Sequence, residues 1–284
     1  MSGNVPIWRR SGSLACPAIL LGLFFAVPFL LTVLVSLSAG PQAAALSNRL
    51  TLDAYGRALS PDYLRIVLYS IGLAIVIGAL SVGIAFPFTC LLARMRRRAQ
   101  AAWLVFLLST LSLSEVLIVF AWQIMLSRRV GLSNILVKLG LLSRPENYAP
   151  SLGGVVVCLV YLVLPFSILM LYPGISRIDA EMTEAARTLG ASPRRTLLTV
   201  VIPNLLRPIG GSFAVAAIMS VGSYVTPLVL GRPVHWTASV QIATTALTDG
   251  DFHTAAAMSL VLLAATLLLL FAGSAGLRRL EGPR

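Results

Sequence analysis

The sequence predicts an all-α integral membrane protein with six transmembrane helices. Composition is the first observation behind this prediction: 57% of the 284 residues are hydrophobic and only 11% are charged, whereas an average soluble domain carries about 25% charged residues. The mean hydropathy of +0.89 agrees with this. So few charged side chains could not cover a soluble core, and we therefore expect the chain to lie in a lipid bilayer.

Long apolar runs are the second observation, because a membrane-spanning helix needs about 20 mostly apolar residues. Six such runs comprise residues 14–37, 66–93, 101–126, about 152–172, 205–230 and 255–277. Prolines within them are compatible with spanning helices, because neighbouring helices can satisfy the freed carbonyl groups. The first run could instead be a secretory signal peptide, but its apolar core exceeds the about 7–15 residues typical of one, which favours a retained helix.

The placement of arginine and lysine is the third observation. If the N-terminus is cytoplasmic, 14 of the 22 basic residues lie on the cytoplasmic side and 8 on the outer side. Cytoplasmic loops are enriched in basic residues, so we expect both termini in the cytoplasm. The short loop "RMRRR" at 94–98 is the strongest single indication. This bias also explains most of the net charge of +12, and the absence of a soluble basic face argues against a nucleic-acid partner.

Two loops on the outer side contain helical patterns. The loop 38–65 includes "LTLDAYGRALSPDYL", which predicts a short interfacial helix and a turn at Ser60 and Pro61. The loop 127–151 includes "GLSNILVKLGLL", whose apolar residues recur at spacings of three and four, as in an amphipathic helix. His235 and His253 are expected to be solvated loop residues. No metal site is predicted, because the three cysteines lie in apolar runs without CxxC spacing and are expected to be buried free thiols.

The segment 173–204 is unusually long and charged for a loop between two apolar runs. Acidic residues precede Gly190, and acids at a helix start with glycine just past its end are typical of a short helix. Ser192 is then a good N-cap for a second helix, with Pro193 at its first position and Pro203 at its end. These features predict two short helices around a tight turn, at the inner face of the membrane. They fit either a structured loop or a docking element for a soluble partner.

This segment, "EAARTLGASPRRTLLTVVIP", resembles the EAA motif of ABC importer permeases. The residues that fall on the motif are Glu184, Ala185, Ala186, Gly190, Ala191 and Pro203. Further stretches, "LTLDAYGRAL", "IAFPFTCLLAR" and "LVYLVLPFSILMLYPGISRID", are similar to type I permeases of the spermidine/putrescine branch. The resemblance covers nearly the whole chain from about residue 50, although related permeases carry phosphonates, opines, thiamine or ferric iron.

The resemblance implies a type I ABC importer permease fold in the bacterial inner membrane. Residues 1–65 would form the N-terminal tail, first helix and outer loop, 66–277 the five-helix transmembrane domain, and 278–284 a cytoplasmic tail. The implied partners are an ATPase subunit dimer that binds ATP and Mg, a second permease, and an external binding protein. A paralogue is favoured over a second copy of this chain as the other permease. The expected cargo is a small polar solute, with a polyamine-like one favoured.

The resemblance also implies that the segment 173–204 couples the permease to the ATPase. The small Ala185 and Ala186 would allow two surfaces to approach closely, and Glu184 could pair with a basic group on the ATPase. Gly190 would allow the sharp turn, and Pro203 would tie the second helix to the fifth span. This chain contains no GxxxxGK[ST] phosphate-binding motif, so we expect no enzymatic activity and no cofactor on it. The acidic sequence "LTDGDFH", at 247–253, is either a solvated loop or a contact for the binding protein.

Candidate residues of the substrate path lie in the third and fifth runs. Glu115 is the only carboxylate within a predicted span, and ionisable residues within membranes tend to mark function. It would suit a cationic substrate, but it could also be held by nearby serines for packing. Ser223, Tyr224 and Thr226 are polar residues in "SVGSYVTPLVLG", which could line the path or could serve helix packing.

Two other functional classes fit the sequence less well. An autonomous ion-coupled secondary transporter or channel would be expected to show paired intramembrane charges and inverted repeats with broken helices, and a single Glu115 gives this little support. An intramembrane enzyme would need a His/Asp/Cys constellation at membrane depth, which the predicted spans lack.

Overall fold

The computed structural model describes residues 7–39, 49–128, 131–140, 143–178, 182, 184, 186 and 188–281. Within these residues the fold is all-α, apart from one ladder of two two-residue strands. The chain divides into two compact units, one made of Met1–Tyr63 with Ile242–Val261 and the other of Leu64–Gln241 with Leu262–Arg284. The prediction of an all-α protein is confirmed.

The first unit is built around the end of helix α1 (Ile7–Leu37). Strands β1 (Ser38–Ala39) and β2 (Arg49–Leu50) pair antiparallel, and α2 (Asp53–Ala58) follows. The Thr51 N–H donates to the Leu37 carbonyl at 2.7 Å, which folds the chain back onto α1. The short helix expected in this loop is therefore confirmed, as is the turn after it, where the Ser60 N–H donates to the Arg57 carbonyl at 3.1 Å.

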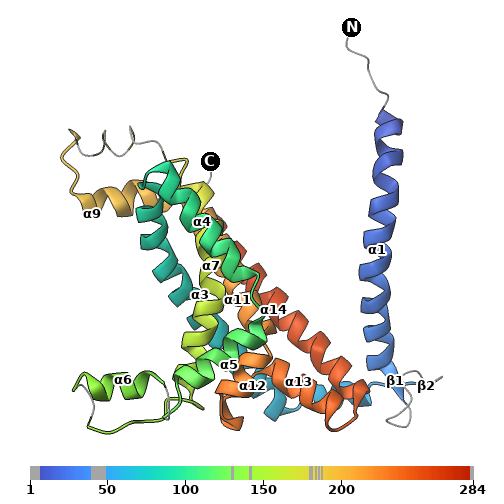
Figure 1. Ribbon diagram of the computed structural model, residues 1–284. Coiled ribbons are helices and arrows are strands. Elements are labelled where there is room, and N and C mark those ends of the chain that lie inside the picture. The colour runs from blue at the N-terminus through green and yellow to red at the C-terminus, as the bar shows by residue number, and fades with distance from the viewer. Residues whose placement is uncertain are drawn as a thin grey trace. The chain divides into compact units, whose positions relative to one another are not determined.

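The second unit holds most of the remaining helices (Figure 1). Their bounds are α3 (Pro61–Ala93), α4 (Arg97–Leu111), α5 (Glu115–Met125), α6 (Leu132–Lys138), α7 (Leu152–Ile175), α9 (Pro193–Thr196), the π-helical turn η1 (Leu197–Val201), α10 (Ile202–Asn204), α11 (Leu206–Gly222), α12 (Val225–Leu230) and the 3₁₀ turn η2 (Pro233–His235). Helices α13 (Ala238–Leu247) and α14 (Phe252–Glu281) belong in part to each unit. The predicted amphipathic helix is confirmed as α6.

Four described helices are long and apolar enough to span a membrane: Ile19–Leu37, Pro61–Ala93, Leu152–Ile175 and Phe252–Gly276. Two bent pairs raise the number to six if each pair counts as one span. These pairs are Arg97–Leu111 with Glu115–Met125, bent by 94°, and Pro193–Asn204 with Leu206–Gly222, bent by 71°. The described helices therefore give four to six spans, and six is reached only if each bent pair counts as one span. The third and fifth predicted runs are broken rather than continuous.

Missing backbone donors explain the breaks around the fifth span. Pro208 has no N–H to offer the carbonyl of Asn204, so the helix turns at Leu205, between α10 and α11. In the same way Pro227 cannot bond the carbonyl of Ser223, and Ser223 adopts an extended conformation (φ −67°, ψ 127°) between α11 and α12. The predicted run 205–230 is therefore two helices.

Helices α7 and α11 lie side by side along the centre of the second unit (Figure 1). Small side chains line the buried face of α11, namely Ser212, Ala216, Ala217 and Ser220. The Ser212 hydroxyl donates to the carbonyl of Ser167 on α7 at 3.4 Å. Small residues let membrane helices approach closely, so α7 and α11 form a packed pair that supports the breaks at either end of α11.

Candidate functional site

The two broken spans meet at one carboxylate. Glu115 is the first residue of α5, and α5 packs against α12, which begins just after the second break (Figure 1). The hydroxyl of Ser223 donates to Glu115 Oε1 at 2.9 Å, and the hydroxyl of Thr226 donates to the same atom at 3.2 Å. The structure thus brings together three of the four path residues chosen from the sequence. Tyr224 is half-buried at the N-cap of α12 and stands outside these hydrogen bonds.

The backbone around Glu115 indicates which surroundings this site requires. Residues Ser112, Leu113 and Ser114 interrupt the third span, and all three are exposed, Leu113 by 54%. Non-helical backbone at membrane depth is tolerated only where protein covers it or where it lines a water-filled cavity. This face of the chain is therefore suited to a second protein subunit or to an aqueous path, and not to lipid.

A cavity of about 200 Å³ opens beside the carboxylate. Helices α4, α5, α7 and α11 contribute to its lining, which includes Thr110, Glu115, Tyr161, Phe166, Met219 and Ser223. Glu115 is the one charged side chain among its lining residues. Sequence reasoning missed Tyr161 and Phe166, because they lie in the uniformly apolar run of α7, where nothing in the pattern separates a cavity-lining aromatic residue from a packed one.

The segment 173–204 has the predicted turn near its centre. Glu184 and Ala186 are helical, while Ala185 lies outside the described residues. Gly190 has φ +83°, and the Ala191 N–H donates to the Ala186 carbonyl at 3.0 Å, which is the helix-ending bond of a Schellman motif. Only glycine adopts this positive φ without strain. The turn after the first short helix is therefore confirmed.

The second short helix begins as predicted but does not continue as a regular α-helix. The Ser192 hydroxyl accepts a hydrogen bond from the Arg195 N–H at 3.4 Å, and Pro193 occupies the first helical position. The π-helical turn η1 then intervenes, because Pro203 has no N–H to donate to the carbonyl four residues earlier. Pro203 is exposed within α10.

Exposed side chains surround the Gly190 turn. Glu184 is exposed, and Leu189 is exposed by 88%, which is unusual for a leucine beside a well-formed turn. Among the described residues, no heavy atom beyond its chain neighbours lies within 4 Å of the position that a Gly190 Cβ would take. The turn is thus free to meet another surface. Leu189 was not chosen from the sequence, because its exposure depends on the turn that follows it.

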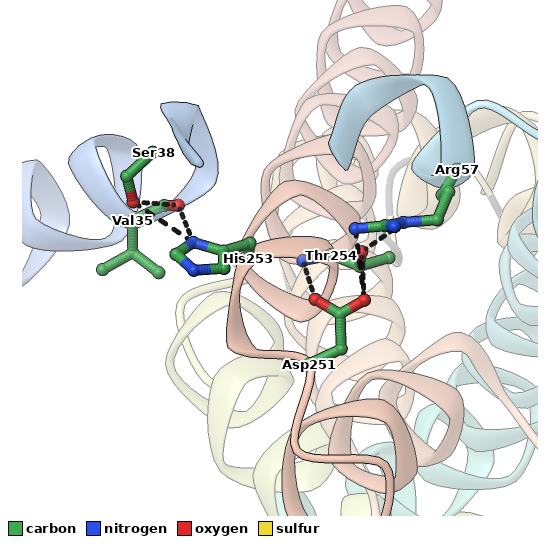
Figure 2. A network of polar contacts seen from close by, with 6 residues as sticks. All are labelled: Val35, Ser38, Arg57, Asp251, His253 and Thr254. Atoms are coloured by element: carbon green, nitrogen blue, oxygen red, sulfur yellow. Dashed lines mark hydrogen bonds and ion pairs between the residues drawn. The ribbon is translucent and has the colours of Figure 1, made fainter. Parts of the chain in front are cut away.

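The loop before α14 corrects one expectation. His253 is only 5% exposed, and its Nδ1 lies 2.9 Å from the Val35 carbonyl and 3.2 Å from the Ser38 hydroxyl (Figure 2). Because a carbonyl only accepts, Nδ1 carries the proton of this hydrogen bond. The prediction that His253 is solvated is wrong, since the folding of β1 and α2 back onto α1 creates a buried site that local sequence does not reveal. His235 is partly exposed.

Asp251 joins the same corner of the first unit (Figure 2). Its Oδ1 accepts from the Thr254 N–H at 3.0 Å, its Oδ2 accepts from the Thr254 hydroxyl at 2.7 Å, and Arg57 Nη2 lies 3.2 Å from Oδ2. Burial raises the pKa of this carboxyl, but the Thr254 hydrogen bonds and the nearby Arg57 and His253 outweigh burial and lower the pKa below its ordinary value. Asp251 therefore caps α14, and its ion pair with Arg57 connects α14 to α2. The other acidic residue of this loop, Asp249, is exposed.

Comparison with known proteins shows which family and which relatives this chain matches. Residues 85–282 match the family described as "Binding-protein-dependent transport system inner membrane component". The spermidine/putrescine transport system permease protein PotB of Salmonella typhimurium is 26% identical over 251 residues, which are 88% of each chain. PotB of Escherichia coli is 29% identical over 64% of this chain and 66% of its own length.

Three further relatives or solved structures are named for other cargo. The sulfate transport system permease protein CysT of Escherichia coli is 29% identical over 42% of this chain and 43% of its own. A crystal structure of a bacterial ABC transporter that imports the acidic polysaccharide alginate superimposes with a TM-score of 0.75 over 96% of both chains, at 15% identity. Another structure of an alginate transporter, in complex with a pentasaccharide-bound periplasmic protein, gives a TM-score of 0.73. These solved structures support the fold.

Proposed function

Since this chain belongs to the family of binding-protein-dependent transport system inner membrane components, we propose that it forms half of the membrane path of an ATP-driven importer. A second permease subunit, a paralogue, supplies the other half, and an external binding protein delivers the solute. A separate ATPase dimer binds ATP and Mg, because this chain has no phosphate-binding motif of its own. Both termini lie in the cytoplasm, as the arginine distribution indicates.

The observation that carries this proposal is the continuity between the exposed turn and the broken-span site. The turn at Gly190 leads through α9, η1 and α10 into α11, and α11 ends at Gly222, directly before Ser223, which bonds Glu115. Helix α11 has 17 residues and is therefore about 25 Å long. A displacement of the turn is transmitted along this rigid element to the residues that line the cavity.

Coupling works through the relative affinity of the ATPase for two states of the permease. A ligand shifts a conformational equilibrium only by its differential affinity for the two states. ATP-driven closure of the ATPase dimer favours the outward-open permease through the segment 173–204, and hydrolysis releases that state. Glu184 and Leu189 contact the ATPase, and Gly190 sets the angle between the two short helices.

The cargo is a small polar solute, and a polyamine-like one is favoured. The support comes from the relatives named for spermidine and putrescine and from Glu115 as the charged side chain of the cavity. The alternative of an ion-coupled transporter or channel has less support, because it would be expected to pair charges within the membrane.

Charge reversal in the exposed turn tests the proposal. Glu184→Arg combined with Gly190→Val should abolish co-purification of the ATPase subunit and reduce ATP-dependent uptake to background. Glu146→Arg is the matched control, because it makes the same charge change in the loop between α6 and α7. If the double variant retained both ATPase binding and uptake at the level of the control, the coupling role of this segment would be refuted.

A further inference from the structure

We propose that the cavity beside Glu115 is a subsite for an organic ammonium group, and that Tyr161 and Phe166 determine its preference for cations. This inference rests on the proposed function, and it names the chemistry that the path accepts. The hydrogen-bonding capacity that the lining residues still have free decides which ligands the cavity accepts.

Two of the three hydroxyl groups in the cavity, those of Thr110 and Ser223, have already used their protons. The Thr110 hydroxyl donates to the Leu107 carbonyl at 2.7 Å, and the Ser223 hydroxyl donates to Glu115 Oε1 at 2.9 Å. A hydroxyl has one proton and two lone pairs, so these two oxygens have only acceptor capacity left for a ligand. Glu115 contributes acceptor oxygens only, when it is ionised. An ammonium group, which has donors and no acceptor, fits this inventory.

Helix α7 adds two aromatic side chains to the lining. The rings of Tyr161 and Phe166 line the cavity, and aromatic faces attract cations. Trp122 contacts Tyr161 edge to face, at a centroid distance of 5.7 Å and an interplanar angle of 66°, which holds the tyrosine ring in place.

Nothing in the lining favours an anion. The lining residues include no lysine, arginine or histidine. The positive end of α5 is the one feature that would attract an anion, and Glu115 occupies its first position, where a carboxylate compensates the helix dipole. The phenol of Tyr161 is the remaining side-chain donor among the lining residues. A sulfate or an acidic sugar would therefore meet the Glu115 charge without a set of donors to offset it.

The cavity has room for a small organic group. Its volume is about 200 Å³, whereas about 10–15 Å³ of such volume is enough to hold one water molecule. An aminoalkyl group of a few carbons therefore fits. An entering ammonium group competes with the hydroxyls of Ser223 and Thr226 for the Glu115 carboxylate. Because these hydrogen bonds join α5 to α12, ligand binding in the cavity affects the contact between the two helices.

Direct binding to the purified importer, containing both permeases and the ATPase but no binding protein, tests this subsite. Putrescine serves as the cation probe and inorganic sulfate as the anion probe, and binding is followed by calorimetry. Wild type should bind putrescine and not sulfate. Glu115→Gln keeps an acceptor for both hydroxyls but removes the charge, so it should weaken putrescine binding by at least about tenfold. Tyr161→Leu should weaken it by about two- to fivefold, and Tyr161→Phe by less.

Controls separate this inference from the proposed function. Glu146→Gln makes the same chemical change outside the cavity and should leave binding unchanged. Assembly with the ATPase and basal ATP hydrolysis, measured on the same samples, report on the importer itself. Normal assembly with equal binding of putrescine to wild type and Glu115→Gln, or with sulfate bound as tightly as putrescine, overturns the subsite alone. Failure of the wild-type chain to assemble with an ATPase overturns the proposed function.

Discussion

Gly174 lies where α7 and the start of α11 approach closely, and replacing it should be costly. A Cβ built on Gly174 would lie 2.7 Å from Pro208 Cγ, 3.1 Å from Pro208 Cβ and 3.3 Å from a methyl carbon of Leu205. Carbon atoms in contact normally lie about 3.5–4.0 Å apart. The Pro208 ring is closed onto its own backbone nitrogen and cannot rotate away. Gly174→Ala must therefore push the start of α11 outward by roughly 1 Å.

Overpacking of this kind costs about 1–3 kcal/mol. For a chain of this size, about 1 kcal/mol lowers the melting temperature by roughly 2–4 °C. We therefore expect Gly174→Ala to lower the apparent Tm of the detergent-purified permease by at least about 2 °C. Because Pro208 and Leu205 stand at the base of α11, ATP-dependent uptake should fall as well.

Gly83→Ala is the matched control for this experiment. Gly83 also lies within an apolar helix, α3, but no heavy atom is within 4 Å of its Cβ position. Alanine is favoured over glycine in a helix by about 0.5–1 kcal/mol, so this variant should be neutral or slightly more stable. Equal melting temperatures for Gly174→Ala and Gly83→Ala would refute the reasoning that the close approach of α7 and α11 is a fixed feature of the fold.

Further predictions concern the capping aspartate and a second crowded glycine. Asp251→Ala should lower the free energy of unfolding by about 1 kcal/mol, the usual cost of losing an N-cap. Asp251→Asn should lose less, because its side chain still accepts from Thr254. Equal losses would argue against the capping role. Because folding lowers the Asp251 pKa, the stability from its charge is complete above about pH 4 and is lost as the pH falls through the lowered pKa. Asp251→Asn should lack that acid-dependent component in melting curves recorded from pH 7 downward. Gly231→Ala should cost about 1–3 kcal/mol, since its Cβ would clash with the Pro227 carbonyl oxygen. A wild-type melting curve would contradict this.

Much of the fold follows from local rules that the sequence displays directly. Apolar runs of sufficient length predict spans, and proline and glycine positions predict turns. Ser192, Pro193 and Gly190 form the predicted cap and turn because each acts on backbone groups within a few residues of itself. The same holds for α2 and α6, whose patterns are complete within one or two turns.

Tertiary structure decided the features that depend on residues far apart in the chain. Glu115 meets Ser223 across 108 positions, and His253 meets Val35 across 218. Local pattern cannot report such contacts, and for that reason His253 was wrongly expected to be solvated and the cavity-lining Tyr161 and Phe166 were missed.

The sequence by itself therefore determined the membrane class, the positions of the long apolar runs and the turn at Gly190, because hydrophobicity and backbone preference are properties of short segments. Only the tertiary structure decided where the third span breaks, how that break faces the interrupted fifth span, and which side chains surround the carboxylate between them. Those outcomes depend on packing, since each helix settles where its neighbours leave room and where its unpaired backbone groups find partners.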